Sequence, residues 1–242
     1  MKLTFLGTRG EIDIRSRKHR MHTSLLISYC RTRVLIDCGL DWLGRLPKPQ
    51  PHAILITHAH PDHAGGLKSG ASCPVFATPE SWKIIAAESI PNRVVIFARQ
   101  PFEIGSLRFE AFPLEHSLRA PAVGFRITCG SASVFYSPDV VSIHELHDAF
   151  RGIQHYIGDG AAITRPILRQ SDHVWVGHAS IRMQLEWCRT EGVPSAIFTH
   201  CGKEIVGGDQ RQIHKKIAAL AKEFGVPTSL ALDGLVIDVS VK

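Results

Sequence analysis

The sequence places His58-Ala59-His60-Pro61-Asp62-His63 directly after a short apolar run, AILIT at residues 53–57. A continuous run of this length is typical of a buried strand. Three imidazoles and a carboxylate just past a strand end need partners, because desolvated polar groups are costly when they are unpaired. Neutral imidazole and carboxylate are the ligands that zinc and its neighbours prefer. The stretch therefore predicts a metal site, rather than a polar loop in which histidines gather by chance.

The spacing within this stretch indicates ligands for two metal ions. In strand-like geometry His58 and His60 face the same way and can share one ion. Asp62 and His63 lie beyond the turn at Pro61 and can reach a second ion.

The motif resembles the signature of the metallo-β-lactamase-fold hydrolases. Residues 1–8 look like the opening strand of that family, and residues 34–39 look like its third strand. The resemblance implies three further ligands on separate strand ends, and the chain offers His116, Asp139 and His200 in that order. It covers nearly the whole chain and implies an α/β fold, a four-layer αββα sandwich.

The resemblance also implies how the ligands divide between two divalent ions. The first ion would take His58, His60 and His116, the second Asp62, His63 and His200, and Asp139 would bridge both. Such a pair lowers the pKa of bound water, so a metal-bound hydroxide can act at neutral pH and hydrolysis is the expected reaction. Zinc is the expected metal, with manganese or iron as alternatives.

His178 is expected to be a catalytic residue, as is Asp62. It lies in VGHAS at residues 176–180, which resembles the His-x-Ser element of the ribonuclease Z and cyclic-phosphate phosphodiesterase branch. The resemblance implies that His178 protonates the leaving oxygen or binds the scissile phosphate. A helix N-terminus beside it is expected to favour an anionic substrate. The alternative is a histidine at the start of a helix with no catalytic part.

Two further residues near the expected site have open roles. Asp159 lies between glycines in GDG, so it either orients His178 or is a turn residue. Cys201 follows an expected ligand directly. We assign it a packing role, because neighbouring residues on a strand point in opposite directions.

The sequence around His116 narrows the substrate class. LEHS at residues 114–117, followed by PAVGFRI at residues 121–127, is similar to the ribonuclease Z and cyclic-phosphate phosphodiesterase branch. The stretch from His116 to Asp139 has no room for the arm with which ribonuclease Z grips tRNA. We therefore expect a phosphodiesterase for a small or cyclic phosphodiester or a nucleic-acid end. The alternatives are an ester or lactone hydrolase on the same metal site, and a nuclease that acts in a complex.

Length and composition agree with a single domain over residues 1–242, because no linker, repeat or charge block divides the chain. No apolar run is long enough for a membrane span, and the N-terminus is typical of a strand rather than a signal peptide. The six cysteines lack CxxC spacing, which favours reduced thiols in the cytoplasm. The family resemblance also allows a homodimer.

The formal net charge of +6 suits phosphate-containing ligands. The densest basic cluster, RSRKHR at residues 15–20, lies between the first two expected strands. It is expected either to steer a phosphodiester or nucleic acid at the mouth of the site, or to be a solvated surface loop.

Periodicity and capping residues predict the remaining elements. Helices are expected at residues 62–67, 79–88, 142–150, 180–190 and 209–224, with Ser142 as the cap of the third. Strands are expected near residues 2–6, 24–29, 33–37, 53–57, 74–77, 94–98, 106–112, 122–128, 132–136, 154–157, 173–176, 195–199 and 235–240.

Overall fold

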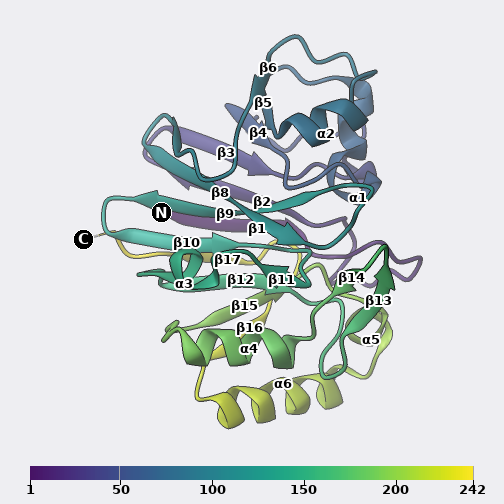
Figure 1. Cartoon of the computed structure of the whole chain (residues 1–242), viewed down its shortest axis with the longest axis vertical. Coiled ribbons are helices and arrows are strands. Elements are labelled where there is room, and N and C mark those ends of the chain that lie inside the picture. Colours follow the sequence, from purple (N-terminus) through teal and green to yellow (C-terminus); the bar gives the residue numbers. More distant parts are fainter. Residues whose placement is uncertain (49, 242) are drawn as a thin grey trace.

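The computed structural model describes residues 1–48 and 50–241, whose strands form two large sheets and a separate hairpin (Figure 1). In spatial order, the first sheet runs through β17 (Val236–Asp238), β1 (Lys2–Gly7), β2 (Ser24–Tyr29), β3 (Thr32–Ile36), β4 (Ala53–Leu55), β5 (Val75–Ala77) and β6 (Arg93–Val95). The second runs through β11 (Ser142–Ile143), β8 (Leu107–Glu115), β9 (Ala122–Cys129), β10 (Ala132–Tyr136), β12 (His155–Asp159), β15 (Ala196–Thr199) and β16 (Thr228–Leu230), with β7 (Phe102–Ile104) beside β8. The hairpin consists of β13 (Ile167–Ser171) and β14 (Val174–His178).

Three of the described helices begin at side-chain caps that the sequence supplies. The helices are η1 (Leu40–Trp42), α1 (Pro61–Ala64), η2 (Gly65–Ser69), α2 (Pro79–Ile84), α3 (Leu146–Phe150), α4 (Ile181–Thr190), α5 (Lys203–Gly207) and α6 (Gln210–Phe224). Hydrogen bonds from backbone N–H groups to the side chains of Thr78, Ser180 and Asp209 cap the starts of α2, α4 and α6, respectively. In the described chain, no helix is both long enough and apolar enough to cross a membrane.

Three apolar cores separate four layers of structure. Leu35 on β3 packs with Trp82 on α2, so this core lies between the first sheet and its helices. Phe5 and Phe125 belong to the core between the two sheets. The third core joins the second sheet to α4 and α6, which cover its outer face in Figure 1. The predicted four-layer αββα sandwich is therefore confirmed.

Each sheet contains a parallel part whose strands end at the same edge. In the first sheet, β3, β4, β5 and β6 are parallel neighbours. In the second, the parallel neighbours are β10, β12, β15 and β16. The carboxyl ends of parallel strands are the usual position of ligand sites in open sheets. Among the predicted ligands, His200 directly follows β15, and His58 and Asp139 come three residues after the ends of β4 and β10.

The predicted helix at residues 142–150 is wrong in its first half. Ser142 and Ile143 form β11, which pairs with β8, and the Ser142 hydroxyl donates to Glu115 instead of capping a helix. Helix α3 begins only after Glu145, which adopts a left-handed conformation with φ 55°. The short elements β7, β13, β16 and α5 were not predicted from the sequence. The helix expected at residues 79–88 is shorter than predicted and ends at Ile84.

Candidate metal centre

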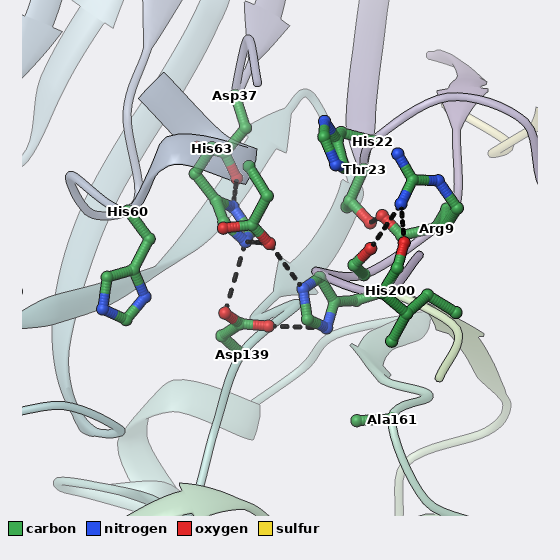
Figure 2. A network of polar contacts seen from close by, with 12 residues as sticks. Arg9, His22, Thr23, Asp37, His60, His63, Asp139, Ala161 and His200 are labelled. Atoms are coloured by element: carbon green, nitrogen blue, oxygen red, sulfur yellow. Dashed lines mark hydrogen bonds and ion pairs between the residues drawn. The ribbon is translucent and has the colours of Figure 1, made fainter. Parts of the chain in front are cut away.

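The histidines and aspartates singled out in the sequence meet where strands of both sheets end, and Figure 2 shows several of them. The segment after β4 and helix α1 carry those of the first sheet, His58, His60, Asp62 and His63. The segments after β8, β10 and β15 carry those of the second, His116, Asp139 and His200. All seven expected ligands thus come together, although they span more than half of the sequence.

One group of ligand atoms forms around His60. It consists of His58, His60, His116 and Asp139, whose atoms lie within 4.8 Å of one another. Nδ1 of His60 is 2.9 Å from Nε2 of His58 and 3.3 Å from Nε2 of His116. Oδ2 of Asp139 is 3.4 Å from Nε2 of His58 and 3.2 Å from Nε2 of His116. This convergence of three imidazoles and a carboxylate is what a single metal ion requires.

A second group shares Asp139 with the first. It consists of Asp62, His63, Asp139 and His200. Oδ2 of Asp62 is 3.3 Å from Nε2 of His63 and 3.1 Å from Nε2 of His200. The carboxylate of Asp139 is 3.2 Å from Nε2 of His63 and 2.8 Å from Nδ1 of His200. Asp139 therefore lies between the two groups, as a bridging ligand would.

Buried polar atoms in the cluster show that these residues fit metal ions. Nε2 of His63, Oδ1 of Asp139 and Nδ1 of His200 are buried without a well-formed hydrogen bond, although each lies within 3.3 Å of an atom of opposite charge type in the cluster. Buried polar atoms held only by such contacts lack the full set of partners that buried polar groups normally have. Divalent cations between these donors would satisfy all three atoms, so the donor set fits the divalent ions that the fold implies.

Protons and charges are closely balanced in the cluster. Burial alone would raise the pKa of Asp139, but His200, His116 and His63 hold it well below its usual range. Burial alone would lower the pKa of His63, but the carboxylates around it, Asp62 foremost, raise it well above its usual value. These opposite shifts favour a proton on His63 that balances part of the negative charge of Asp62 and Asp139, whereas burial lowers the pKa values of His58, His60 and His116.

Asp37, which the sequence did not single out, holds His63 from behind. Its Oδ2 accepts a hydrogen bond from Nδ1 of His63 at 2.8 Å, and its Oδ1 accepts one from the N–H of Thr57 at 2.9 Å. The bond to Asp37 leaves Nε2 of His63 free to face the cluster (Figure 2). Carboxylates commonly orient metal-binding histidines in this way. The signal available in the sequence was an aspartate that directly follows the apolar residues 34–36, and the structure shows it to be completely buried.

His178 lies beside the cluster at the end of β14. Its Nδ1 donates to Oδ2 of Asp159 at 2.8 Å and lies 3.9 Å from Oδ1 of Asp139. Burial would lower the pKa of His178, but Asp159 raises it above its usual value. Asp159 ends β12 and is fully buried, so it is not a turn residue. The pairing that the sequence suggested between Asp159 and His178 is present.

A buried glutamine ties together the two segments that carry this pair. Oε1 of Gln184 accepts from the N–H of Asp159 at 2.9 Å, and its Nε2 donates to the carbonyls of Asp159 at 2.8 Å and Ala179 at 3.2 Å. Gly158 permits this close approach, because a Cβ there would lie 2.4 Å from Oε1 of Gln184. The sequence offered no sign of this role, since Gln184 lies in helix α4, 25 residues along the chain from Asp159.

The expected anion site at the start of α4 is not available. The N–H groups of Ile181 and Arg182 donate to the carbonyls of Ala162 and Ile163 at 2.8 and 3.0 Å. The next N–H, that of Met183, donates to the Ser180 hydroxyl. The N–H groups of the first turn are therefore satisfied within the protein and are not free to bind an anion directly, and the prediction that the helix N-terminus favours an anionic substrate stays a prediction.

A cavity of about 930 Å³ opens over the cluster. Its wall includes His60, His178 and His200, the β13–β14 hairpin, and the segment from Gly10 to Ile12. A volume of this size suits a small molecule or one end of a larger one.

The basic loop at residues 15–20 is attached to the body of the protein by acidic side chains. Arg15 pairs with Asp41 at 2.8 Å, and the N–H of Arg20 donates to Asp233 at 2.7 Å. Among the described residues that line the cavity, none comes from this loop. The loop therefore forms no part of the described cavity wall, and its expected role in steering a phosphodiester or nucleic acid stays a prediction.

The turn before this loop packs directly against the cluster. Buried Arg9 donates to Asp41 at 2.5 Å. A Cβ at Gly10 would lie 2.9 Å from Cε1 of His200, so glycine is needed at this close approach. Cys201 is buried in the core between the second sheet and its helices, in agreement with the packing role assigned to it.

A four-layer αββα sandwich with such a cluster at its strand ends defines a metal-dependent hydrolase of the metallo-β-lactamase fold. The model of the family described as Beta-lactamase superfamily domain matches residues 32–201, and the chain belongs to this family. The predicted resemblance is thus confirmed.

Known relatives are similar over different shares of the chain. Ribonuclease Z from Methanopyrus kandleri is 31% identical over 142 residues, which cover 52% of this chain and 49% of that protein, about half of its length. Ribonuclease Z from Mycolicibacterium paratuberculosis is 24% identical over 276 aligned positions, which cover 96% of each protein. The structure of the metallo-beta-lactamase fold protein YhfI from Bacillus subtilis matches with a TM-score of 0.77 at 17% identity, over 98% of each chain.

Proposed function

We propose that the protein is a binuclear metal-dependent phosphodiesterase that acts on a small or cyclic phosphodiester or on a nucleic-acid end. The observation that carries this proposal is His178, held by Asp159 at 2.8 Å beside the metal cluster and facing the cavity. Phosphodiester cleavage needs a proton for the leaving alkoxide, and a histidine placed here is suited to deliver one. Similarity to proteins named ribonuclease Z supports the same reaction class.

The proposed ligands keep the assignment made from the sequence. They are His58, His60 and His116 for one ion, Asp62, His63 and His200 for the other, and Asp139 for both. Zinc is the proposed metal, because imidazoles outnumber carboxylates in this set. When bound, the two cations supply a water-derived nucleophile at neutral pH and neutralise charge that develops on the phosphate.

The protein's own groups supply orientation and proton transfer. Asp159 binds Nδ1 of His178, which leaves Nε2 as the nitrogen that can donate to a leaving oxygen. Asp62 and His178 both line the cavity, and we propose both as catalytic residues. Gln184 keeps the backbone of Asp159 in place and so acts as a positioning residue.

An ester or lactone hydrolase on the same metal site is the second candidate. The apolar side chains of Ile12, Ile167 and Leu168 on the cavity wall favour it, because they could hold an acyl chain. Arg119, Arg165 and Arg169 on the same wall favour a phosphodiester substrate, because their positive charge suits its phosphate. The cytoplasm is the proposed compartment, which is supported by cysteines that are free in the described chain.

Hydrolysis of an activated phosphodiester and of a lactone, each by zinc-loaded and manganese-loaded protein, tests the proposal. We expect the phosphodiester to be cleaved, and Asp139→Ala to lose bound metal and activity together. Asp238→Ala on β17 is the matched control, because its side chain is exposed at the far edge of the first sheet. Full activity of Asp139→Ala would overturn the bridging assignment, and lactone hydrolysis alone would overturn the substrate class.

A further inference from the structure

Beyond the metal cluster, the described wall of the cavity carries cationic side chains from separate segments. They are Arg119 after β8, Arg165 between β12 and β13, Arg169 on β13, and Lys203 at the start of α5. All are exposed, and within residues 1–48 and 50–241 none of them pairs with a carboxylate. We call these residues the basic rim.

The basic rim is left with little negative charge to balance it. Some exposed cations elsewhere have acidic partners, such as Arg182 with Glu223 and Lys216 with Glu204 at 2.7 Å. Glu204 lies on the cavity wall but is taken by Lys216, so Glu11 is the acidic side chain that remains on the described wall outside the cluster. Clefts lined by one sign of charge raise the local concentration of oppositely charged ligands.

Part of the basic rim is fixed relative to the metal cluster. The N–H of Gly177 donates to the carbonyl of His116 at 2.9 Å, and the carbonyl of Gly177 accepts from Nδ1 of His116 at 2.9 Å. Val176, the neighbour of Gly177, is the strand partner of Arg169. The hairpin backbone that carries Arg169 is therefore bound directly to a proposed metal ligand, so the side chain of Arg169 starts from a defined position relative to the cluster.

We propose that the basic rim binds a second phosphate of the substrate, separate from the phosphodiester that is cleaved. This inference rests on the proposed phosphodiesterase function. Guanidinium groups match phosphate oxygens with paired hydrogen bonds, which explains the excess of arginine. A cavity of about 930 Å³ has room for a nucleoside between the two phosphates, and Ile12 and Leu168 offer apolar contacts to it. The second phosphate belongs either to the end of a small molecule or to the next nucleotide of a strand.

A pair of chromogenic substrates that differ only in the second phosphate tests the inference. One is thymidine 5′-(p-nitrophenyl phosphate), and the other carries an additional 3′-phosphate. In both, water adds to phosphorus, the bond to the phenolic oxygen breaks, and p-nitrophenolate leaves. At low ionic strength we expect kcat/KM to be about tenfold or more higher for the compound with the 3′-phosphate, because charge-assisted hydrogen bonds are strong.

Variants of the basic rim link the effect to its residues. Arg169→Ala and Arg165→Ala are expected to bring the ratio of the two kcat/KM values close to one. Arg108→Ala is the matched control, an exposed arginine near the start of β8 and remote from the cavity, and it should keep the wild-type ratio.

The outcomes separate the two proposals. Equal kcat/KM for both substrates in the wild-type protein would overturn the basic rim while phosphodiesterase activity stands. Cleavage of neither substrate would overturn the proposed function itself. A third substrate, with a second thymidine esterified to the 3′-phosphate, identifies the source: retention of the advantage indicates a nucleic-acid strand, and its loss indicates a terminal phosphate on a small molecule.

Discussion

Replacing Asp37 by asparagine is expected to weaken metal binding, although Asp37 is not itself a proposed ligand. Asparagine has the same shape and tolerates the left-handed backbone of this position, where φ is 64°. Its amide oxygen can still accept from Thr57, but its NH₂ group then faces Nδ1 of His63. His63 must accept at Nδ1 and carry its proton on Nε2, the nitrogen that faces the cluster.

The size of the effect follows from the burial of this contact. Loss of the outer partner of a metal-binding histidine typically costs about 10- to 100-fold in metal affinity. Asp37 is completely buried and its bond to His63 is 2.8 Å, so water cannot replace the lost acceptor. We therefore expect the upper part of that range, about 2–3 kcal/mol of binding free energy. Competition for zinc between the protein and a coloured chelator at pH 7 measures it.

Asp172→Asn is the matched control for this substitution. Asp172 also has a positive φ, of 47°, but it is exposed at the tip of the β13–β14 hairpin. The metal affinity of Asp172→Asn should equal that of the wild type. Urea unfolding of both variants without metal checks that each of them folds. A metal affinity of Asp37→Asn within twofold of the wild type would refute the reasoning, as would an equal loss in Asp172→Asn.

Three further substitutions test other parts of the structure. His178→Ala should lower turnover about 100-fold or more on a diester with an alkoxide leaving group, because general acids contribute about 10²–10⁴-fold. Its metal content should stay unchanged. A fall in metal content, measured by atomic absorption, would make His178 a ligand instead. Burial lowers the pKa of His22 from 6.5 to about 4, so its contribution to stability is complete above pH 6.5 and is lost as the pH falls towards 4. Between pH 7 and pH 5, the free energy of unfolding should therefore fall by about 2 kcal/mol less in His22→Asn than in the wild type, as measured by urea unfolding. An identical fall in the two proteins would contradict this. Gln184→Met leaves backbone groups of Asp159 and Ala179 unpaired and should lower the free energy of unfolding by about 3 kcal/mol, whereas an unchanged urea midpoint would show that these bonds contribute nothing.

The sequence reveals the cluster well because its residues follow recognisable strands. His58, Asp139 and His200 each come at or shortly after the end of an apolar run, and the carboxyl ends of parallel strands share one edge. The four-layer sandwich followed from the family resemblance, since periodicity by itself indicates only an α/β fold. The assignment of each ligand to an ion stays a prediction.

Features that depend on packing between distant segments could not be predicted. Gln184 has the pattern of an ordinary helix residue, and its role arises only because Gly158 lets β12 approach it. Ser142 has the pattern of a helix cap, but pairing with β8 overrides that local preference. The first turn of α4 is a common anion site in isolation, yet the carbonyls of Ala162 and Ile163 already occupy it.

The cluster draws its side chains from both sheets, with His63 from one and Asp139 and His200 from the other. Ions bound there would hold the two halves of the molecule together and would be released when they separate. A ligand that binds only the folded chain adds about 4 kcal/mol of stability at 1,000 times its dissociation constant. Chains made during metal shortage would therefore open more often and be degraded by proteases sooner. The amount of this protein in a cell, and not only its catalytic rate, would then follow the metal supply.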